Sequence, residues 1–131
     1  MEAIGTGEIL IGDNCAIEQN VHINSMGSRL VIADNVTIAA NTFITNLDHE
    51  YRDVTKSVMD QGHILNTTTI GEGCFLGYGV SILAGTILGK HCVVGTGTVL
   101  KGQYPDYSVI VGVPGKVIKQ YDTETNEWRK C

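Results

Sequence analysis

A six-residue spacing of aliphatic side chains is the feature that most constrains how this chain can fold. Seven consecutive positions at this spacing hold Ile, Leu or Val, namely Ile64, Ile70, Leu76, Ile82, Leu88, Val94 and Leu100. The same period occurs upstream in two blocks, Ile11, Ile17 and Ile23, then Ile32, Ile38 and Ile44. A period of six matches neither the 3.6-residue repeat of a helix nor the two-residue alternation of a strand. The pattern therefore predicts short strands separated by tight turns.

A solenoid accounts for such a period. Three units close one triangular coil, and successive coils stack at about 4.8 Å, so that residue i lies over residue i + 18. A small residue recurs four positions after the aliphatic one, as at Cys74, Val80, Cys92 and Thr98. We expect both to point into the prism. Cys15, Cys74 and Cys92 are then buried thiols rather than disulfide partners or metal ligands.

The period is interrupted after Ile44 by a segment that begins with "NLDHEYRD". The next aliphatic residue is expected at position 50, but the spacing resumes at Ile64, which indicates fourteen inserted residues. A loop of this length in a compact chain is typical of a functional segment. We predict a repeat domain over residues 1–119 with an inserted loop at about 46–63, followed by a C-terminal extension over residues 120–131.

Composition and charge exclude several classes of protein. With 131 residues and 43% hydrophobic side chains, the chain suits one globular domain. It has neither a run of about 18 apolar residues nor a signal-peptide pattern, so we expect a cytoplasmic protein without a membrane partner. Its net charge of −5 argues against binding nucleic acid. Residues 1–82 carry −7 and residues 83–131 carry +2, so an anionic ligand should prefer the C-terminal half.

The repeat units resemble those of a known enzyme family. "IGEGCF", "LGYGVS", "LGKHCV" and "VGTGTV", followed by "VGVPGKVIK", are similar to the hexapeptide-repeat acyltransferases, which include maltose, galactoside and xenobiotic O-acetyltransferases. The resemblance covers roughly residues 8–119. It implies an all-β fold, a left-handed parallel β-helix of about five coils with an inserted loop and a short C-terminal extension. It also implies a homotrimer with active sites between subunits.

The resemblance makes His49 the candidate catalytic residue, because in this family an extended loop bears the catalytic histidine. A neutral imidazole near pH 7 can take the proton of an attacking hydroxyl or amine. Many relatives carry another histidine two positions earlier, where this chain has Leu47. Loop residues and one aromatic residue are candidates for binding the acceptor: Asp48, Glu50, Tyr51 and Phe75. Asp48, Glu50 or Asp53 could instead orient the imidazole.

The other three histidines, His22, His63 and His91, are interpreted as surface residues. The carbonic anhydrase branch of the fold needs a pair of histidines five positions apart, and this chain has none, so no metal site is expected.

The resemblance also implies that acetyl-CoA lies in a groove between subunits, against the C-terminal coils. Nine residues are candidates for binding it, namely Ala84 and Gly85 beside the pantetheine arm, the backbone of Gly95, Thr96 and Gly97, Pro114 in the last turn, and Lys101, Lys116 and Lys119 near the phosphates.

Together these features predict an acetyl-CoA-dependent acetyltransferase that acts on a small-molecule acceptor, most simply a sugar or related hydroxyl, by direct transfer with a histidine base. Two alternatives remain open. One is N-acetylation of an amino sugar or sugar nucleotide, and the other is a non-catalytic β-helix that serves in assembly.

Overall fold

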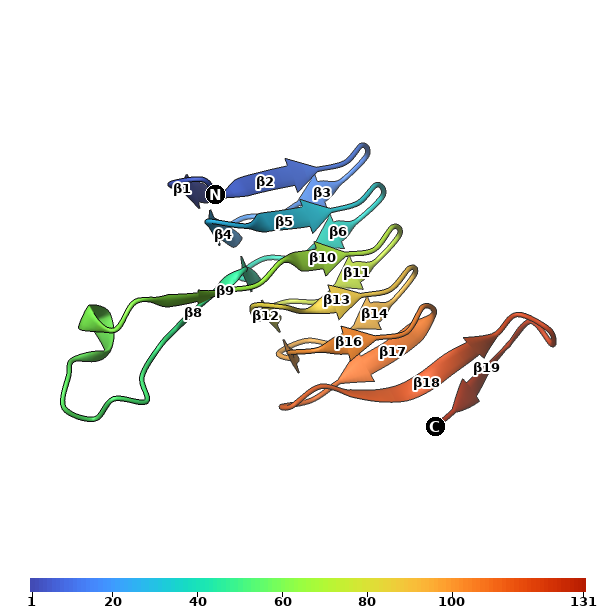
Figure 1. Ribbon diagram of the computed structural model, residues 1–131. Helices are drawn as coiled ribbons and strands as arrows, with labels where there is room; N and C mark the ends of the chain where they lie inside the picture. Colours follow the sequence, from blue (N-terminus) through green and yellow to red (C-terminus); the bar gives the residue numbers. More distant parts are fainter.

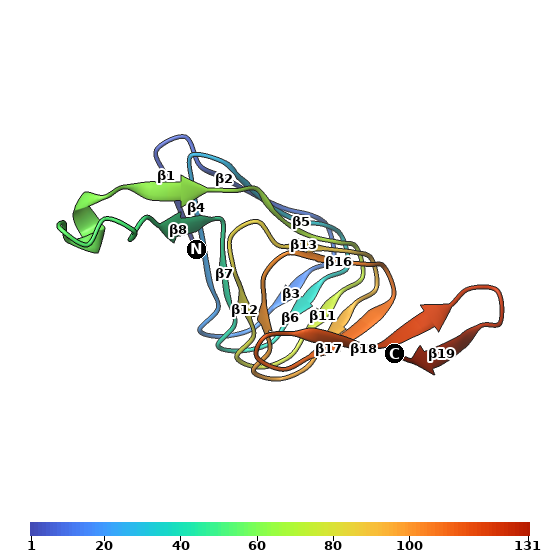
Figure 2. The same ribbon diagram turned by 60° about the horizontal axis from the view of Figure 1, so that its bottom comes forward.

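The computed structural model describes residues 1–131 and forms a triangular solenoid with three parallel sheets as its faces (Figures 1 and 2). Sheet A contains β1 (Glu2–Ile4), β4 (His22–Met26), β7 (Phe43–Thr45), β12 (Ser81–Ile82) and β15 (Val99–Leu100). Sheet B contains β2 (Glu8–Ile11), β5 (Arg29–Ile32), β10 (Thr68–Ile70), β13 (Ile87–Leu88) and β16 (Gln103–Tyr104). Sheet C contains β3 (Ala16–Ile17), β6 (Thr37–Ile38), β11 (Phe75–Leu76), β14 (Val93–Val94) and β17 (Ser108–Val111).

Each sheet thus receives one strand from each of five coils, and the stacked parallel sheets are those of a left-handed β-helix. After the loop, paired residues are 18 positions apart, as for Phe75 with Val93 and Ser81 with Val99, until β16 and β17, where the separation is 16. In the first two coils the separation is 21, as for Ile11 with Ile32. The predicted fold is confirmed.

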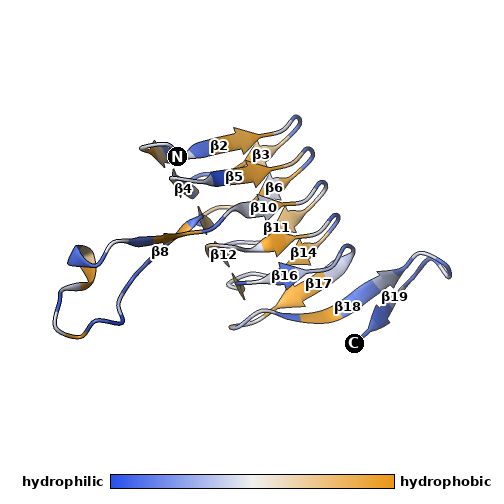
Figure 3. Cartoon of the chain, viewed as in Figure 1, coloured by the Kyte–Doolittle hydropathy of each residue, from blue (hydrophilic) through white to orange (hydrophobic).

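The core is the interior of the prism. The periodic aliphatic residues from Ile70 to Leu100 are each at most 1% exposed. The predicted small positions are also buried, namely Cys74, Val80, Thr86, Cys92 and Thr98. All four cysteines are free, and the Cys92 thiol together with burial raises the pKa of Cys74. The strands of the coils are mostly hydrophobic, whereas most of the inserted loop is hydrophilic (Figure 3).

The prediction that Ile64 is a core position was wrong. Ile64 is 38% exposed and lies in β9 (His63–Leu65), which pairs antiparallel with β8 (Leu47–His49) in the inserted loop. The solenoid resumes at β10, where Ile70 pairs with Ile32 at a separation of 38 residues instead of 18. The insertion therefore comprises twenty residues rather than fourteen. Ile64 belongs to the loop hairpin, and its six-residue distance from Ile70 matches the repeat by coincidence.

The two irregular parts of the chain project from opposite sides of the solenoid (Figure 2). The loop, which also contains the short 3-10 helix η1 (Val58–Asp60), leaves between sheets A and B. At the other side β18 (Lys116–Asp122) turns back antiparallel along β17 and pairs with β19 (Glu127–Lys130). The predicted boundary at residue 119 falls inside β18. The structure contains no helix whose length and hydropathy would suit a membrane span.

Candidate active site

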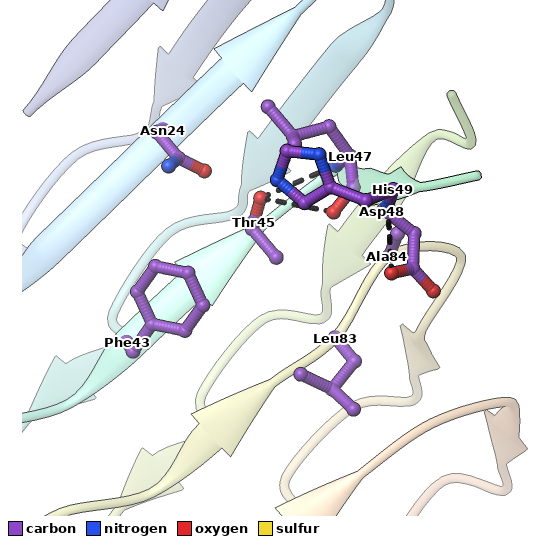
Figure 4. Close-up of a pocket in the computed structure, with 8 residues that line it drawn as sticks. All are labelled: Asn24, Phe43, Thr45, Leu47, Asp48, His49, Leu83 and Ala84. Atoms are coloured by element: carbon purple, nitrogen blue, oxygen red, sulfur yellow. Dashed lines mark hydrogen bonds between the residues drawn. The ribbon is translucent and has the colours of Figure 1, made fainter. Parts of the chain in front are cut away.

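A pocket of about 250 Å³ lies at the corner of the prism where β7 leads into the inserted loop. Figure 4 shows the side chains around it, which are Asn24, Phe43, Thr45, Leu47, Asp48, His49, Leu83 and Ala84. They come from β4, β7 and β8 on one side, and from the turn after β12 on the other. The loop and three successive coils therefore build the pocket together.

His49 presents one edge of its ring to this pocket. Its Nδ1 atom is buried without a hydrogen-bond partner, so Nε2 is the ring nitrogen with access to the pocket. Figure 4 shows that nitrogen directed toward the Asn24 side chain. An accessible imidazole nitrogen facing a pocket is the geometry that a general base requires.

His63 packs against His49 from the facing strand of the loop hairpin. The two residues are partners in the β8–β9 pairing, and their ring centroids are 5.1 Å apart with planes tilted by 52°. Sequence reasoning missed this contact because His63 becomes a neighbour only once the loop forms a hairpin. His22 and His91 do not line the pocket. His91 instead stacks on Tyr107, beside the C-terminal hairpin.

The carboxylate of Asp48 is held by two partners other than the His49 ring. Its Oδ1 accepts a 2.9 Å hydrogen bond from the His49 backbone N–H, and its Oδ2 lies 3.3 Å from Lys101 Nζ. The backbone hydrogen bond is the main reason that the pKa of Asp48 is lowered, and Lys101 adds to the effect. Asp48 therefore links the loop to the last coil.

Glu50 and Tyr51 do not line the pocket. Both carboxylate oxygens of Glu50 accept hydrogen bonds of 2.6 Å from the Arg52 guanidinium, which lowers the pKa of Glu50 to about 2. The Tyr51 side chain is 67% exposed. Glu50 therefore makes a local contact within the loop and does not face the pocket.

Asn24 is a pocket residue that sequence reasoning missed. Its Oδ1 atom is buried without a partner, although it borders the pocket. The adjacent Asn46 is fully paired, since it donates to Ser25 Oγ at 2.7 Å and accepts from the Met26 N–H at 2.9 Å. No sequence signal distinguishes Asn24 from other polar residues of a coil.

The aromatic residue of the pocket is Phe43 rather than Phe75. Phe75 lies on β11 in sheet C and is not among the lining residues. Phe43 lies on β7, directly before the loop, and its ring forms one wall (Figure 4).

The candidate coenzyme-binding residues fall into three groups in one chain. Ala84 is 6% exposed and lines the pocket, and Gly85 follows it in a turn with φ of +83° that donates its N–H to Thr68 Oγ1. Lys101 lies at the same corner, one coil further on. Gly95, Thr96 and Gly97 form the turn between sheets C and A. Pro114, Lys116 and Lys119 lie at the end of the solenoid, in the turn after β17 and in β18.

Comparison with known proteins agrees with this architecture. The family model described as bacterial transferase hexapeptide (six repeats) matches residues 67–102. The Escherichia coli K12 protein WbbJ, named as a lipopolysaccharide biosynthesis O-acetyl transferase, is 36% identical over 138 residues, which include all of this chain and 70% of that protein. The chain belongs to the hexapeptide-repeat acetyltransferase family. The resemblance predicted from the repeat units is confirmed.

Solved structures of hexapeptide-repeat acetyltransferases share the fold. VCA0836 of Vibrio cholerae, crystallised with acetyl coenzyme A, superposes with a TM-score of 0.82 at 24% identity, over 92% of this chain and 64% of that one. A maltose O-acetyltransferase from Clostridium difficile 630 superposes with a TM-score of 0.66 at 26% identity, over 92% of this chain and 71% of that one.

Proposed function

We propose that this chain transfers an acetyl group from acetyl-CoA to a hydroxyl of a sugar or related small molecule, with His49 as the general base. The observation that carries the proposal is the ring of His49 at the pocket, with Nδ1 buried and Nε2 accessible. The O-acetyl transferase name of WbbJ and the maltose O-acetyltransferase likeness support a hydroxyl acceptor.

The chain's own residues have three tasks in this reaction. His49 Nε2 accepts the proton of the acceptor hydroxyl as its oxygen forms a bond to the acetyl carbon. The same ring then returns that proton to the leaving thiolate when the carbon–sulfur bond breaks, so that no covalent intermediate on the protein is needed. Asn24 Oδ1 offers a hydrogen-bond acceptor to a second hydroxyl of the acceptor molecule. Nε2 acts as the base in the tautomer in which Nδ1 carries the ring proton.

The pocket fits an acetyl thioester on its other side. When bound, acetyl-CoA would supply the activated acetyl group, and the methylene groups of its pantetheine arm are apolar, as are Leu83 and Ala84. Lys101 lies at the same corner and carries a positive charge toward solvent, 61% exposed. The VCA0836 structure with acetyl coenzyme A is consistent with this choice of co-substrate.

A homotrimer remains part of the proposal. Phe75 and Val93 are exposed apolar side chains on the outer face of sheet C, a surface that a second subunit could cover. Assembly could also bring the three groups of coenzyme-binding candidates to one groove. A sedimentation mass of a single chain at micromolar concentration would contradict this part.

The proposed function is tested by thiol release from acetyl-CoA in the presence of hexoses, disaccharides and amino sugars. We expect turnover with hydroxyl acceptors that lack an amine. Turnover only with amino sugars would favour N-acetylation instead. If calorimetry detects no acetyl-CoA binding, the chain is better described as an assembly protein.

Replacing Asn24 by alanine tests the acceptor side of the pocket. We expect the KM for the acceptor to rise about tenfold, because one hydrogen bond in a buried pocket contributes about 1 to 1.5 kcal/mol. The KM for acetyl-CoA serves as the internal control and should not change. A rise in both constants would mean that Asn24 supports the pocket as a whole rather than the acceptor.

A further inference from the structure

Part of the pocket wall beside His49 is apolar. Phe43 and Leu47 both border the space between His49 and Asn24, and Leu83 lies opposite (Figure 4). Leu47 and His49 are two positions apart on β8, so their side chains leave the strand on the same face. An acceptor whose hydroxyl reaches His49 therefore places its neighbouring carbon against Leu47.

The polar groups of the pocket offer few free hydrogen-bonding sites. The Thr45 hydroxyl is occupied, since it accepts from the Leu47 N–H at 3.2 Å and lies 3.5 Å from the Leu47 carbonyl. Both oxygens of Asp48 are occupied by the His49 N–H and by Lys101. Asn24 Oδ1 is left as the one buried acceptor without a partner. Phe43 and Leu47 themselves offer no side-chain hydrogen bond to a further hydroxyl placed against them.

We propose that the acceptor is a deoxy sugar, specifically a 6-deoxyhexose, whose methyl group packs against Leu47 and Phe43 while its ring hydroxyls meet His49 and Asn24. This inference rests on the proposed function. A sugar with a hydroxymethyl group at the same carbon brings a further hydroxyl to the apolar wall, where it loses its water and finds no partner. Leu47 and Phe43 are then the residues that determine specificity.

The size of the expected preference follows from the chemistry of the wall. An apolar pocket rejects an analogue that adds one hydroxyl by up to about a hundredfold. We therefore expect the 6-deoxy member of a matched pair to have a kcat/KM about ten to a hundred times that of its hydroxylated partner.

Matched methyl glycosides provide the test. The first pair is the α-L-rhamnoside and the α-L-mannoside, and the second is the α-L-fucoside and the α-L-galactoside. In each pair the two sugars differ only by the hydroxyl on carbon 6. The full-length chain is assayed for thiol release from acetyl-CoA, and acetylated products are counted by mass spectrometry.

Variants at Leu47 test whether the apolar wall causes the preference for 6-deoxy sugars. Leu47→Asn should reduce the kcat/KM ratio of each pair to about threefold or less, because the amide can pair with the added hydroxyl, whereas Leu47→Met should keep the ratio. Leu65→Asn is the matched control, since Leu65 is the cross-strand partner of Leu47 in the hairpin but does not line the pocket. It should leave the ratio unchanged. Far-ultraviolet circular dichroism confirms that each variant keeps its β-helix.

Two results would overturn the inference while leaving acetyl transfer intact. One is equal or better turnover of the hydroxylated member of both pairs. The other is turnover of hydroxymethyl sugars in the general acceptor panel with none of the 6-deoxy sugars. If Leu47→Asn kept the preference for 6-deoxy sugars, Leu47 would not determine specificity. The proposed contact between the sugar methyl group and Leu47 would then be wrong.

Discussion

We expect His49→Ala to lower kcat by a factor of about 10² to 10⁴, the usual contribution of a general base, with the fold intact. The loss falls on kcat because the imidazole acts on the proton during transfer and contributes little to holding the substrates. The ring lies at the pocket with one accessible nitrogen, and we expect the other residues that line the pocket to stay in place when it is removed. Thiol release from acetyl-CoA measures turnover, and circular dichroism monitors the fold.

The control for this variant is His91→Asn. His91 is an exposed histidine in a left-handed turn with φ of +50°, a conformation that asparagine adopts readily, and it does not line the pocket. It should keep full turnover. Turnover of His49→Ala within about threefold of the parent chain would mean that the proton leaves the acceptor by another route, and the assignment of the base would then be abandoned.

The largest effect on stability is expected from the centre of the prism. Leu88 is 1% exposed and belongs to the single row of large side chains that fills the solenoid. Leu88→Ala should lower the free energy of unfolding by about 2 to 5 kcal/mol, because the coils above and below hold the backbone and prevent the cavity from collapsing. Urea denaturation at fixed protein concentration measures the change.

The neighbouring residue supplies the control. Ile87 lies on the same strand, β13, but its side chain points outward and is 45% exposed. Ile87→Ala should change the free energy of unfolding by at most about 0.5 to 1 kcal/mol. Equal losses for the two variants would be inconsistent with the alternation that directs one side chain into the prism and the next to solvent.

The solenoid was predictable because its information is local and repeated. A strand that is buried on one face must place an aliphatic residue inward in every unit, and a narrow prism leaves room for one large and one small side chain per unit. The period of six therefore predicted Leu76, Leu88 and Leu100 as core residues, and all three are buried. The error at Ile64 has the same origin, since spacing alone does not tell a coil from a hairpin that happens to be in phase.

The pocket was only partly predictable because its members are far apart in sequence. His49 was identified through its loop, but Asn24 lies 25 positions earlier and Lys101 pairs with Asp48 across 53 positions. These separations depend on the 21-residue first coils and on the twenty inserted residues, neither of which the repeat itself specifies. His63 became a neighbour of His49 through the pairing of β8 with β9 inside the loop.

The sequence by itself determined the architecture, the family and the loop that bears the candidate base. Each of these features depends on residues that are close together or regularly spaced in the sequence, for which backbone geometry allows one arrangement. The tertiary structure alone decided which side chains surround His49, that Asp48 is bound to Lys101, and that Asn24 Oδ1 borders the pocket without a partner. Those contacts arise where the loop meets several stacked coils, so they depend on the exact number of residues between them.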